Sequence, residues 1–121
     1  MENQKLETIQ KENNLNDVYR VGDEGPGGAY HEYAICKAGT QEKVMTVFYQ
    51  KGPRNEEGSY AGYLDGDLLE CVRDRMKSFQ AGPFASEYNA RVLEHVEAAL
   101  QALNDRVVER ANRGVLGKNE K

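Results

Sequence analysis

Short runs of β-branched and aromatic residues mark the first half of the chain. The runs lie at 18–21 (VYRV), 30–36 (YHEYAIC) and 44–49 (VMTVFY), and such residues favour strands. A Gly-Pro-Gly-Gly turn at 25–28 separates the first two runs, and the 36–43 connection is short enough for a hairpin. The pattern predicts a small antiparallel sheet of about three strands.

The second half changes to apolar residues spaced three and four apart, which is typical of amphipathic helices. Asp67 can cap a first helix, with Glu70 three residues later as in a capping box. Gly82-Pro83 should end it, with Gly82 in the left-handed conformation. A second helix should begin near Ser86 and end at Gly114, which makes it roughly 27 residues and about 40 Å long. The predicted fold is α+β, a small sheet followed by a long two-helix hairpin.

Two stretches lie outside these elements. Residues 1–16 are mostly polar and predict a flexible N-terminal arm or a short surface helix, so 17–121 should form a single sheet-plus-hairpin domain. Residues 51–66 hold four glycines and one proline, which excludes a regular element. The tyrosines at 60 and 63 favour an ordered loop there.

Composition narrows the classes of function. The chain has 121 residues and a net charge of -4, with a pI of about 5.2 and a mean hydropathy of -0.79. This charge argues against salt-driven binding to DNA or RNA polymers. No apolar run approaches the roughly 20 residues of a membrane helix, and the N-terminus lacks the apolar stretch of a signal peptide. We therefore expect a cytosolic protein without a membrane partner.

Cysteine and histidine are scarce. Cys36 and Cys71 are expected to be buried small hydrophobes rather than a disulfide in a reducing cytosol. There are only two histidines, so we expect no His-rich metal site and no metal or other cofactor. No Ser/His/Asp set, Cys/His spacing or Cys-x-x-Cys is present, and the acidic residues around 65–74 suit helix caps and solvated surface. We therefore expect no catalytic residues.

Arg106, Arg110 and Arg113 lie on one face at the end of the second predicted helix. One interpretation is structural, because arginines at a helix C-terminus complement its dipole. The other is a phosphate clamp, because a guanidinium binds phosphate oxygens in a bidentate way. The spacing alone leaves both open.

The joint between the helices offers a second candidate site. Phe79 and Phe84 flank the break and are either core residues or a stacking platform for a base. Asn89, in the first turn of the second helix, could read an adenine edge with its amide, although a polar residue there needs no special role. A basic turn at 50–54 (QKGPR) lacks the end and the following helix of a P-loop, and it is either a solvated turn or an anion contact.

Several of these segments together resemble the phage anti-Thoeris sponge family, whose helical hairpin also occurs in anti-CBASS sponges. The resemblance extends over most of the chain and rests on these segments: GAYHEY at 28–33, FYQKGP at 48–53, Asp74-Arg75, FQAGPF at 79–84, Asn89, Arg106-x3-Arg110 and RGVLG at 113–117. Their order and spacing carry the similarity.

The resemblance implies a non-catalytic protein that sequesters a cyclic ADP-ribose isomer, the signal of a TIR-domain enzyme, in the cytoplasm of the infected bacterial host. It implies ligand contacts from Arg54, Phe79, Asn89, Arg106 and Arg110, and also from Arg113. Cyclic di- or trinucleotides of CBASS defence are the alternative ligands. A phosphodiesterase that degrades the signal and a plain protein-interaction module are the competing classes of function.

Assembly follows from the length of the second helix. Its projecting apolar part needs a partner, most simply a second copy of the chain. Asn89 and Arg106 lie about 25 Å apart along the axis, which is farther than one folded ligand spans. An antiparallel homodimer would bring them together in two equivalent pockets at its interface. The resemblance is also compatible with a hexamer of three dimers.

Overall fold

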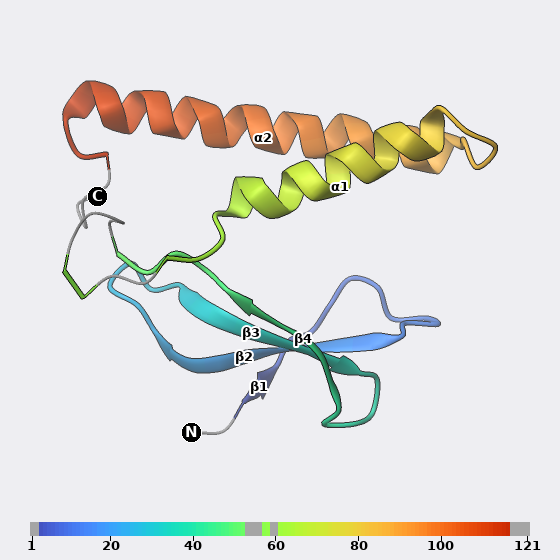
Figure 1. Ribbon diagram of the computed structural model, residues 1–121, viewed down its shortest axis with the longest axis horizontal. Helices are drawn as coiled ribbons and strands as arrows, with labels where there is room; N and C mark the ends of the chain where they lie inside the picture. Colours follow the sequence, from blue (N-terminus) through green and yellow to red (C-terminus); the bar gives the residue numbers. More distant parts are fainter. Residues whose placement is uncertain (1–2, 53–56, 59–60, 117–121) are drawn as a thin grey trace. The chain divides into compact units, whose positions relative to one another are not determined.

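The computed structural model describes residues 3–52, 57–58 and 61–116. The chain consists of two compact units, Met1–Tyr63 and Leu64–Lys121. The first unit holds the strands and the second the helices (Figure 1). The architecture is α+β, as predicted. The expected division into an arm at 1–16 and one domain at 17–121 stays a prediction.

The first unit is a four-stranded antiparallel sheet, one strand more than the sequence predicts. Its strands are β1 (Gln4–Lys5), β2 (Asn16–Glu24), β3 (Tyr30–Lys37) and β4 (Lys43–Phe48), in the spatial order β1-β2-β3-β4. The additional strand β1 lies within the segment expected to be an arm or a surface helix. Among the described residues 3–15 no helix forms.

A carboxylate explains why the polar N-terminal segment joins the sheet. Asp17 on β2 is only 8% exposed, and its Oδ2 accepts a 2.9 Å hydrogen bond from the Gly39 N–H. The ammonium of Lys5 on β1 lies 3.6 Å from the same oxygen, and the Asn14 amide donates to Oδ1 at 3.5 Å. The Gly39 hydrogen bond first, and then Lys5 and Asn14, lower the pKa of Asp17 against the opposing effect of burial. The ionised carboxylate thus ties β1 and the β3–β4 turn to β2.

The hydrophobic core of the sheet is small. Its buried apolar residues among those described are Ala34 and Cys36 of β3 and Val47 of β4. Cys36 is therefore buried, as expected. Cys71 is exposed on the first helix, so that part of the prediction is wrong. It falls one residue before Val72 and lies off the apolar stripe that packs between the helices.

The second unit is a hairpin of α1 (Asp65–Gln80) and α2 (Glu87–Arg113), which pack against each other. Both predicted ends of α2 are confirmed. The Ser86 hydroxyl accepts a 3.0 Å hydrogen bond from the Asn89 N–H, which satisfies one free donor of the first turn. Gly114 ends the helix with φ 74°, a conformation that glycine adopts without steric cost.

The predicted ends of α1 need correction. The N-cap is Leu64, and Asp67 is the third helical residue, whose Oδ2 accepts a 2.9 Å hydrogen bond from the Leu64 N–H. Glu70 instead lies 3.5 Å from Arg73. At the other end the C-cap Ala81 keeps a right-handed conformation, with φ -85° and ψ -3°, and Gly82 has no positive φ. A tight turn with 3.1 Å hydrogen bonds from Ala81 and Gly82 to earlier carbonyls ends the helix.

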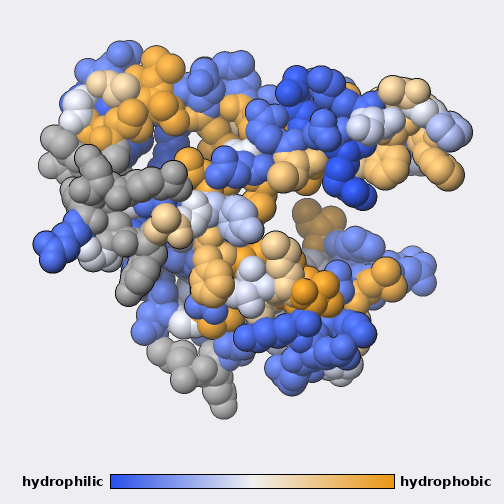
Figure 2. Space-filling model, in the orientation of Figure 1, coloured by the Kyte–Doolittle hydropathy of each residue, from blue (hydrophilic) through white to orange (hydrophobic). Residues whose placement is uncertain are grey.

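The helices form no fully buried core by themselves. Arg73 of α1 donates a 2.8 Å hydrogen bond to Glu97 of α2, which raises the pKa of Arg73. None of the residues of α1 or α2 is buried, and orange residues reach the surface towards both ends of the hairpin (Figure 2). Val107 and Val108 near the end of α2 are 47% and 50% exposed. Within the described chain, neither helix is long and apolar enough to cross a bilayer.

Candidate functional site

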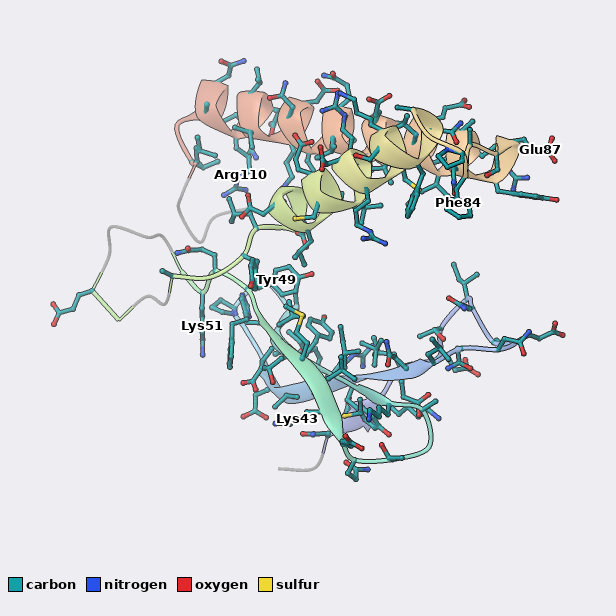
Figure 3. All side chains as sticks on the ribbon, turned by 45° about the vertical axis from the view of Figure 1, so that its right-hand side comes forward. Lys43, Tyr49, Lys51, Phe84, Glu87 and Arg110 are labelled. Atoms are coloured by element: carbon teal, nitrogen blue, oxygen red, sulfur yellow. The ribbon has the colours of Figure 1, made fainter. Side chains whose placement is uncertain are left out.

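The predicted ligand residues of the helical unit fall into two groups. Phe79 lies in the last turn of α1 and Asn89 in the first turn of α2, so both flank the joint at one end of the hairpin. The arginines at 106, 110 and 113 lie in the last turns of α2, at its other end. Figure 3 shows Phe84 of the joint and Arg110 towards opposite ends of α2.

The joint is held by side chains rather than left as a free loop. The Gln80 side-chain oxygen accepts a 2.9 Å hydrogen bond from the Ser86 N–H. The Asn89 amide nitrogen donates to the Phe84 carbonyl at 3.2 Å. This bond uses one of the two N–H groups of the amide, and the amide oxygen accepts no hydrogen bond from the described residues. Asn89 therefore keeps one donor and one acceptor in a fixed plane, which is the pattern that pairs with an adenine edge.

The two aromatic residues of the joint differ in environment. Phe79 is half-buried, whereas Phe84 is 74% exposed. The guanidinium carbon of Arg75 lies over the Phe79 ring, 5.4 Å from its centroid. One helical turn separates the two residues, so the contact follows from their i, i+4 spacing. Neither ring is sealed in a core.

The three arginines of α2 have different surroundings. Arg113 forms an ion pair with Glu109, one turn earlier. Arg110 is half-buried, and its Nη2 donates a 2.9 Å hydrogen bond to the Val115 carbonyl just beyond the helix. Arg106 is exposed, and no hydrogen bond or ion pair within the described part of the chain involves its side chain. Arg110 and Arg113 lie in the last turn of α2, where a positive charge complements the helix dipole, whereas Arg106 has no partner among the described residues.

Distance separates the two groups within one chain. Asn89 and Arg106 are 17 positions apart on a continuous helix, and the rise of an α-helix makes this about 25 Å. The structure brings Phe79 and Asn89 to one joint and the three arginines to one helix end. It does not bring the two groups together within one chain.

The remaining predicted contact, Arg54, lies outside the described residues. Just before it, the Gln50 amide donates to the Gly52 carbonyl at 2.8 Å, and Gly52 has φ 77°. Tyr63 pairs with this segment, because the Gln50 N–H donates to the Tyr63 carbonyl at 2.8 Å. The described part of the basic turn, residues 50–52, is thus held by hydrogen bonds at Gln50.

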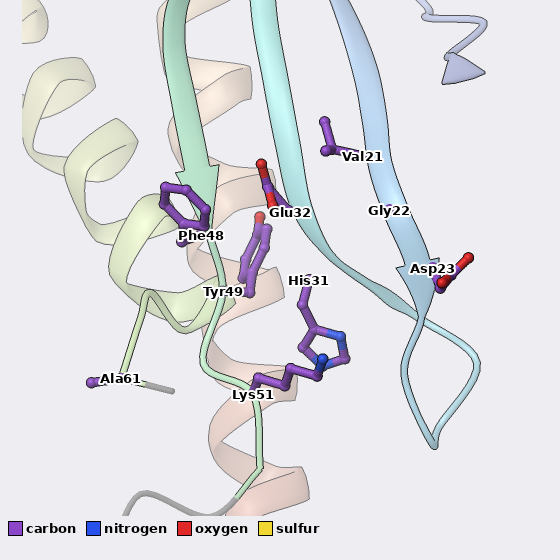
Figure 4. A pocket seen from close by; sticks show the side chains of 9 residues that line it. All are labelled: Val21, Gly22, Asp23, His31, Glu32, Phe48, Tyr49, Lys51 and Ala61. Carbon is purple, nitrogen blue, oxygen red and sulfur yellow. The ribbon is translucent and has the colours of Figure 1, made fainter. Parts of the chain in front are cut away.

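The sheet unit holds a pocket of about 490 Å³ that the sequence gives no reason to expect. It opens where the end of β2, the start of β3 and the end of β4 meet (Figure 4). The side chains that line it include His31, Glu32, Phe48 and Lys51. His31 Nδ1 is buried and has no hydrogen-bond partner among the described residues, and the ring packs so closely on Gly25 that a Cβ there would lie 2.3 Å from it. None of the predicted ligand residues that the structure describes lines this pocket.

Metal ligands do not cluster in the described residues: no group of three or more His, Cys, Asp or Glu side chains lies close enough to hold an ion. The donors at the joint and at the end of α2 are instead amides, aromatic rings and guanidinium groups. This is a set suited to a base and to phosphate oxygens.

Comparison with known proteins tests the family resemblance, not the geometry of the site. No family model matches the chain. A curated relative, Thoeris anti-defense 1 of Bacillus phage SBSphiJ7, is 40% identical over 79 residues, which cover 65% of this chain and 55% of the relative. The comparison confirms the resemblance to the anti-Thoeris family. The chain spans about half the length of this anti-Thoeris relative.

Proposed function

We propose that the protein is a phage anti-Thoeris protein that binds a cyclic ADP-ribose isomer in the cytoplasm of the infected host and does not cleave it. Holding this signal, the product of a TIR-domain enzyme, would keep the defence effector inactive. The similarity to Thoeris anti-defense 1 is the observation that carries the proposal. The name of the relative supports Thoeris defence as the target. The amide, aromatic and guanidinium groups of the hairpin support a ligand that has a base and phosphates.

The chemistry of the hairpin suits such a ligand. A cyclic ADP-ribose isomer carries a purine base, riboses and a pyrophosphate. Phe79 would stack on the base, and the Asn89 amide would pair with its edge. Arg106 and Arg110 would bind the pyrophosphate, assisted by Arg113 and by Arg54. A sponge must outcompete the receptor of the signal, which requires nanomolar binding, about -12 kcal/mol.

The 25 Å between the two groups supports a pocket shared by two copies of the chain. In an antiparallel homodimer the joint of one copy meets the arginine end of the other, and each dimer has two equivalent pockets. The exposed Val107 and Val108 would be covered by the same contact. Three such dimers in a hexamer remain compatible with this arrangement.

The test is to identify what the protein holds after purification from cells that express an active TIR enzyme. Heat denaturation should release an intact cyclic ADP-ribose isomer, which mass spectrometry identifies by its mass and by comparison with standards. Protein from cells with a catalytically inactive TIR enzyme is the matched control and should release none. Release of a cyclic di- or trinucleotide from cells with a CBASS enzyme, and of nothing from TIR cells, would reassign the ligand.

A second measurement separates a sponge from an enzyme. The purified protein is incubated with excess signal, denatured, and the signal quantified. Full recovery after many hours is the expected result. Progressive conversion of excess signal to a linear product would mean that the protein is a phosphodiesterase and would overturn the non-catalytic proposal.

A further inference from the structure

Two arginines of the helical unit contact aromatic rings near the joint. Arg75 of α1 lies over Phe79, with its guanidinium carbon 5.4 Å from the ring centroid. Arg91 of α2 lies over Tyr88, at 5.9 Å. Both side chains are exposed. These pairs look alike, but only the first involves a residue of the proposed ligand site.

Arg75 also differs from several other arginines of the hairpin in having no carboxylate partner in the part of the chain that the structure describes. Arg73 is paired with Glu97 and Glu70, and Arg113 is paired with Glu109. Within the described residues, no hydrogen bond or ion pair involves the Arg75 guanidinium. Its charge is therefore not neutralised locally.

A guanidinium over an aromatic ring can still bind an anion. In the contact with the ring, the flat face of the guanidinium lies against the face of the ring. Phosphate oxygens bind instead along the N–H edge of the guanidinium. A purine that stacks on Phe79 carries its phosphates a few bonds from the base. A cation within 6 Å of that ring then lies close to the phosphate charge.

We propose that Arg75 is a further ligand-binding residue, which contacts the anionic part of the purine ligand that stacks on Phe79. This inference rests on the proposed function, because it concerns the same ligand. It gives the base-binding end of each chain a positive charge of its own. The pocket then does not depend only on Arg106 and Arg110, and a neutral nucleoside gains less from it than a nucleotide does.

Arg91 provides a matched control. It has the same charge and an equivalent contact with a ring in the same part of the hairpin. It lies two positions after Asn89, which turns it about 200° around α2, away from the amide that would read the base. A neutral substitution at Arg91 therefore removes the same positive charge from the hairpin but leaves the proposed ligand contact in place.

The experiment measures the Kd for a cyclic ADP-ribose isomer made by a TIR enzyme, at low and high salt. We expect Arg75→Gln to weaken binding about 10-fold or more at low salt, and Arg91→Gln to leave it within about 2-fold. Arg75→Gln should also flatten the salt dependence, because one charge contact is lost. Arg75→Lys should fall between Arg75→Gln and the parent, because it keeps the charge without the planar N–H edge.

Unchanged melting temperatures without ligand would show that the variants fold. If the parent binds and Arg75→Gln binds equally well, or if both glutamine variants lose the same affinity, Arg75 is not a ligand contact and the proposed function still stands. If Arg75→Gln loses affinity but keeps the salt dependence of the parent, Arg75 only supports the ring, which also overturns the proposal. If the parent binds no isomer, the proposed function fails and the inference fails with it.

Discussion

Arg110 and Val115 are joined by two hydrogen bonds across the end of α2. The Arg110 guanidinium donates to the Val115 carbonyl at 2.9 Å, and the Val115 N–H donates to the Arg110 carbonyl at 3.0 Å. With Gly114 left-handed between them, this is a C-terminal cap that satisfies free carbonyls at the helix end. A residue expected to bind phosphate therefore also has a structural role.

The double role of Arg110 predicts a difference between two variants. Arg106→Ala should weaken ligand binding by about 1.5–3 kcal/mol, roughly 10- to 150-fold, because a charge-assisted contact is lost. Its free energy of unfolding should not change, since Arg106 has no partner in the described chain. Arg110→Ala should lose similar affinity and also about 0.5–1.5 kcal/mol of stability, the usual value of one hydrogen bond.

Denaturant unfolding and calorimetric titration on the same samples measure both quantities. Glu109→Gln releases Arg113 from its ion pair and leaves the Arg110–Val115 bonds in place, so it measures the contribution of Arg113 separately. An Arg110→Ala variant that is destabilised but binds with the affinity of the parent would restrict Arg110 to the cap. Parent-like binding by Arg106→Ala would remove that residue from the site.

Phe79 tests the base-stacking interpretation. Phe79→Leu roughly keeps the volume, so most of the stability should remain. Loss of the aromatic face should lower affinity by about 1–3 kcal/mol. Phe84→Leu, at a side chain that is 74% exposed, is the control and should change neither quantity much. If Phe79→Leu lowers the denaturant midpoint and leaves calorimetric affinity per folded molecule intact, Phe79 is a packing residue only.

The fold follows from the sequence where local chemistry decides it. Ser86 and Gly114 mark the ends of α2, because a hydroxyl cap and a left-handed glycine act within one turn of their positions. The start of α1 is harder to predict, because the Asp67 carboxylate accepts a hydrogen bond from the N–H of Leu64, three residues earlier. Leu64 is apolar and is not a residue type typical of an N-cap. β1 has no local signal, since two polar residues become a strand only through pairing with β2 and through Asp17.

The site is only partly visible in the sequence. Helical spacing alone groups the arginines of α2 on one face and assigns Phe79 and Asn89 to the same joint. It does not reveal that Arg110 donates a hydrogen bond to Val115 or that Glu109 pairs with Arg113. Each of these side chains can reach several partners, and the rotamer that it adopts decides which one it contacts. The i, i+4 spacing of Arg75 and Phe79 was a usable signal for their contact. The pocket beside His31 depends on how three strand ends meet, which no local pattern encodes.

Asp17 predicts how the stability of the protein depends on pH. The pKa of Asp17 is lowered in the folded chain, chiefly by the Gly39 N–H and also by Lys5. A lowered folded-state pKa means that the unfolded chain binds the proton more tightly. The stabilisation is therefore complete above the unfolded pKa and is lost as the pH falls through that value towards the folded one.

Thermal unfolding from pH 7 down to pH 3 should thus show a decrease in melting temperature that Asp17→Asn reduces. The variant should also be less stable than the parent at pH 7, because a neutral amide cannot replace the charged acceptor. Lys5→Met is a second variant that removes the weaker, more exposed partner, and it should have a smaller effect. Parallel pH curves for the parent and Asp17→Asn would contradict the prediction.

The shared pocket makes the strongest prediction, because it concerns two chains at once. If Asn89 of one chain and Arg106 of the other contact the same ligand, Asn89→Ala and Arg106→Ala chains each bind poorly alone. In a mixed dimer, one pocket inherits both substitutions and the other inherits neither. Equal mixing gives heterodimers in about half of the dimers, and each has one intact pocket. Titration should then find about one high-affinity site for every four chains, against about one per chain in the parent.

A double variant, Asn89→Ala with Arg106→Ala, supplies the control for this mixture. Paired with either single variant, it leaves no pocket with both native residues, so mixing should restore nothing. Subunit exchange is verified by native mass spectrometry of chains that differ in isotope label. A single-chain pocket cannot produce recovery on mixing, because each chain would keep its own substitution in its own pocket. Absence of recovery after confirmed exchange would therefore return the site to one chain, whereas recovery with native affinity requires that each ligand touch two copies.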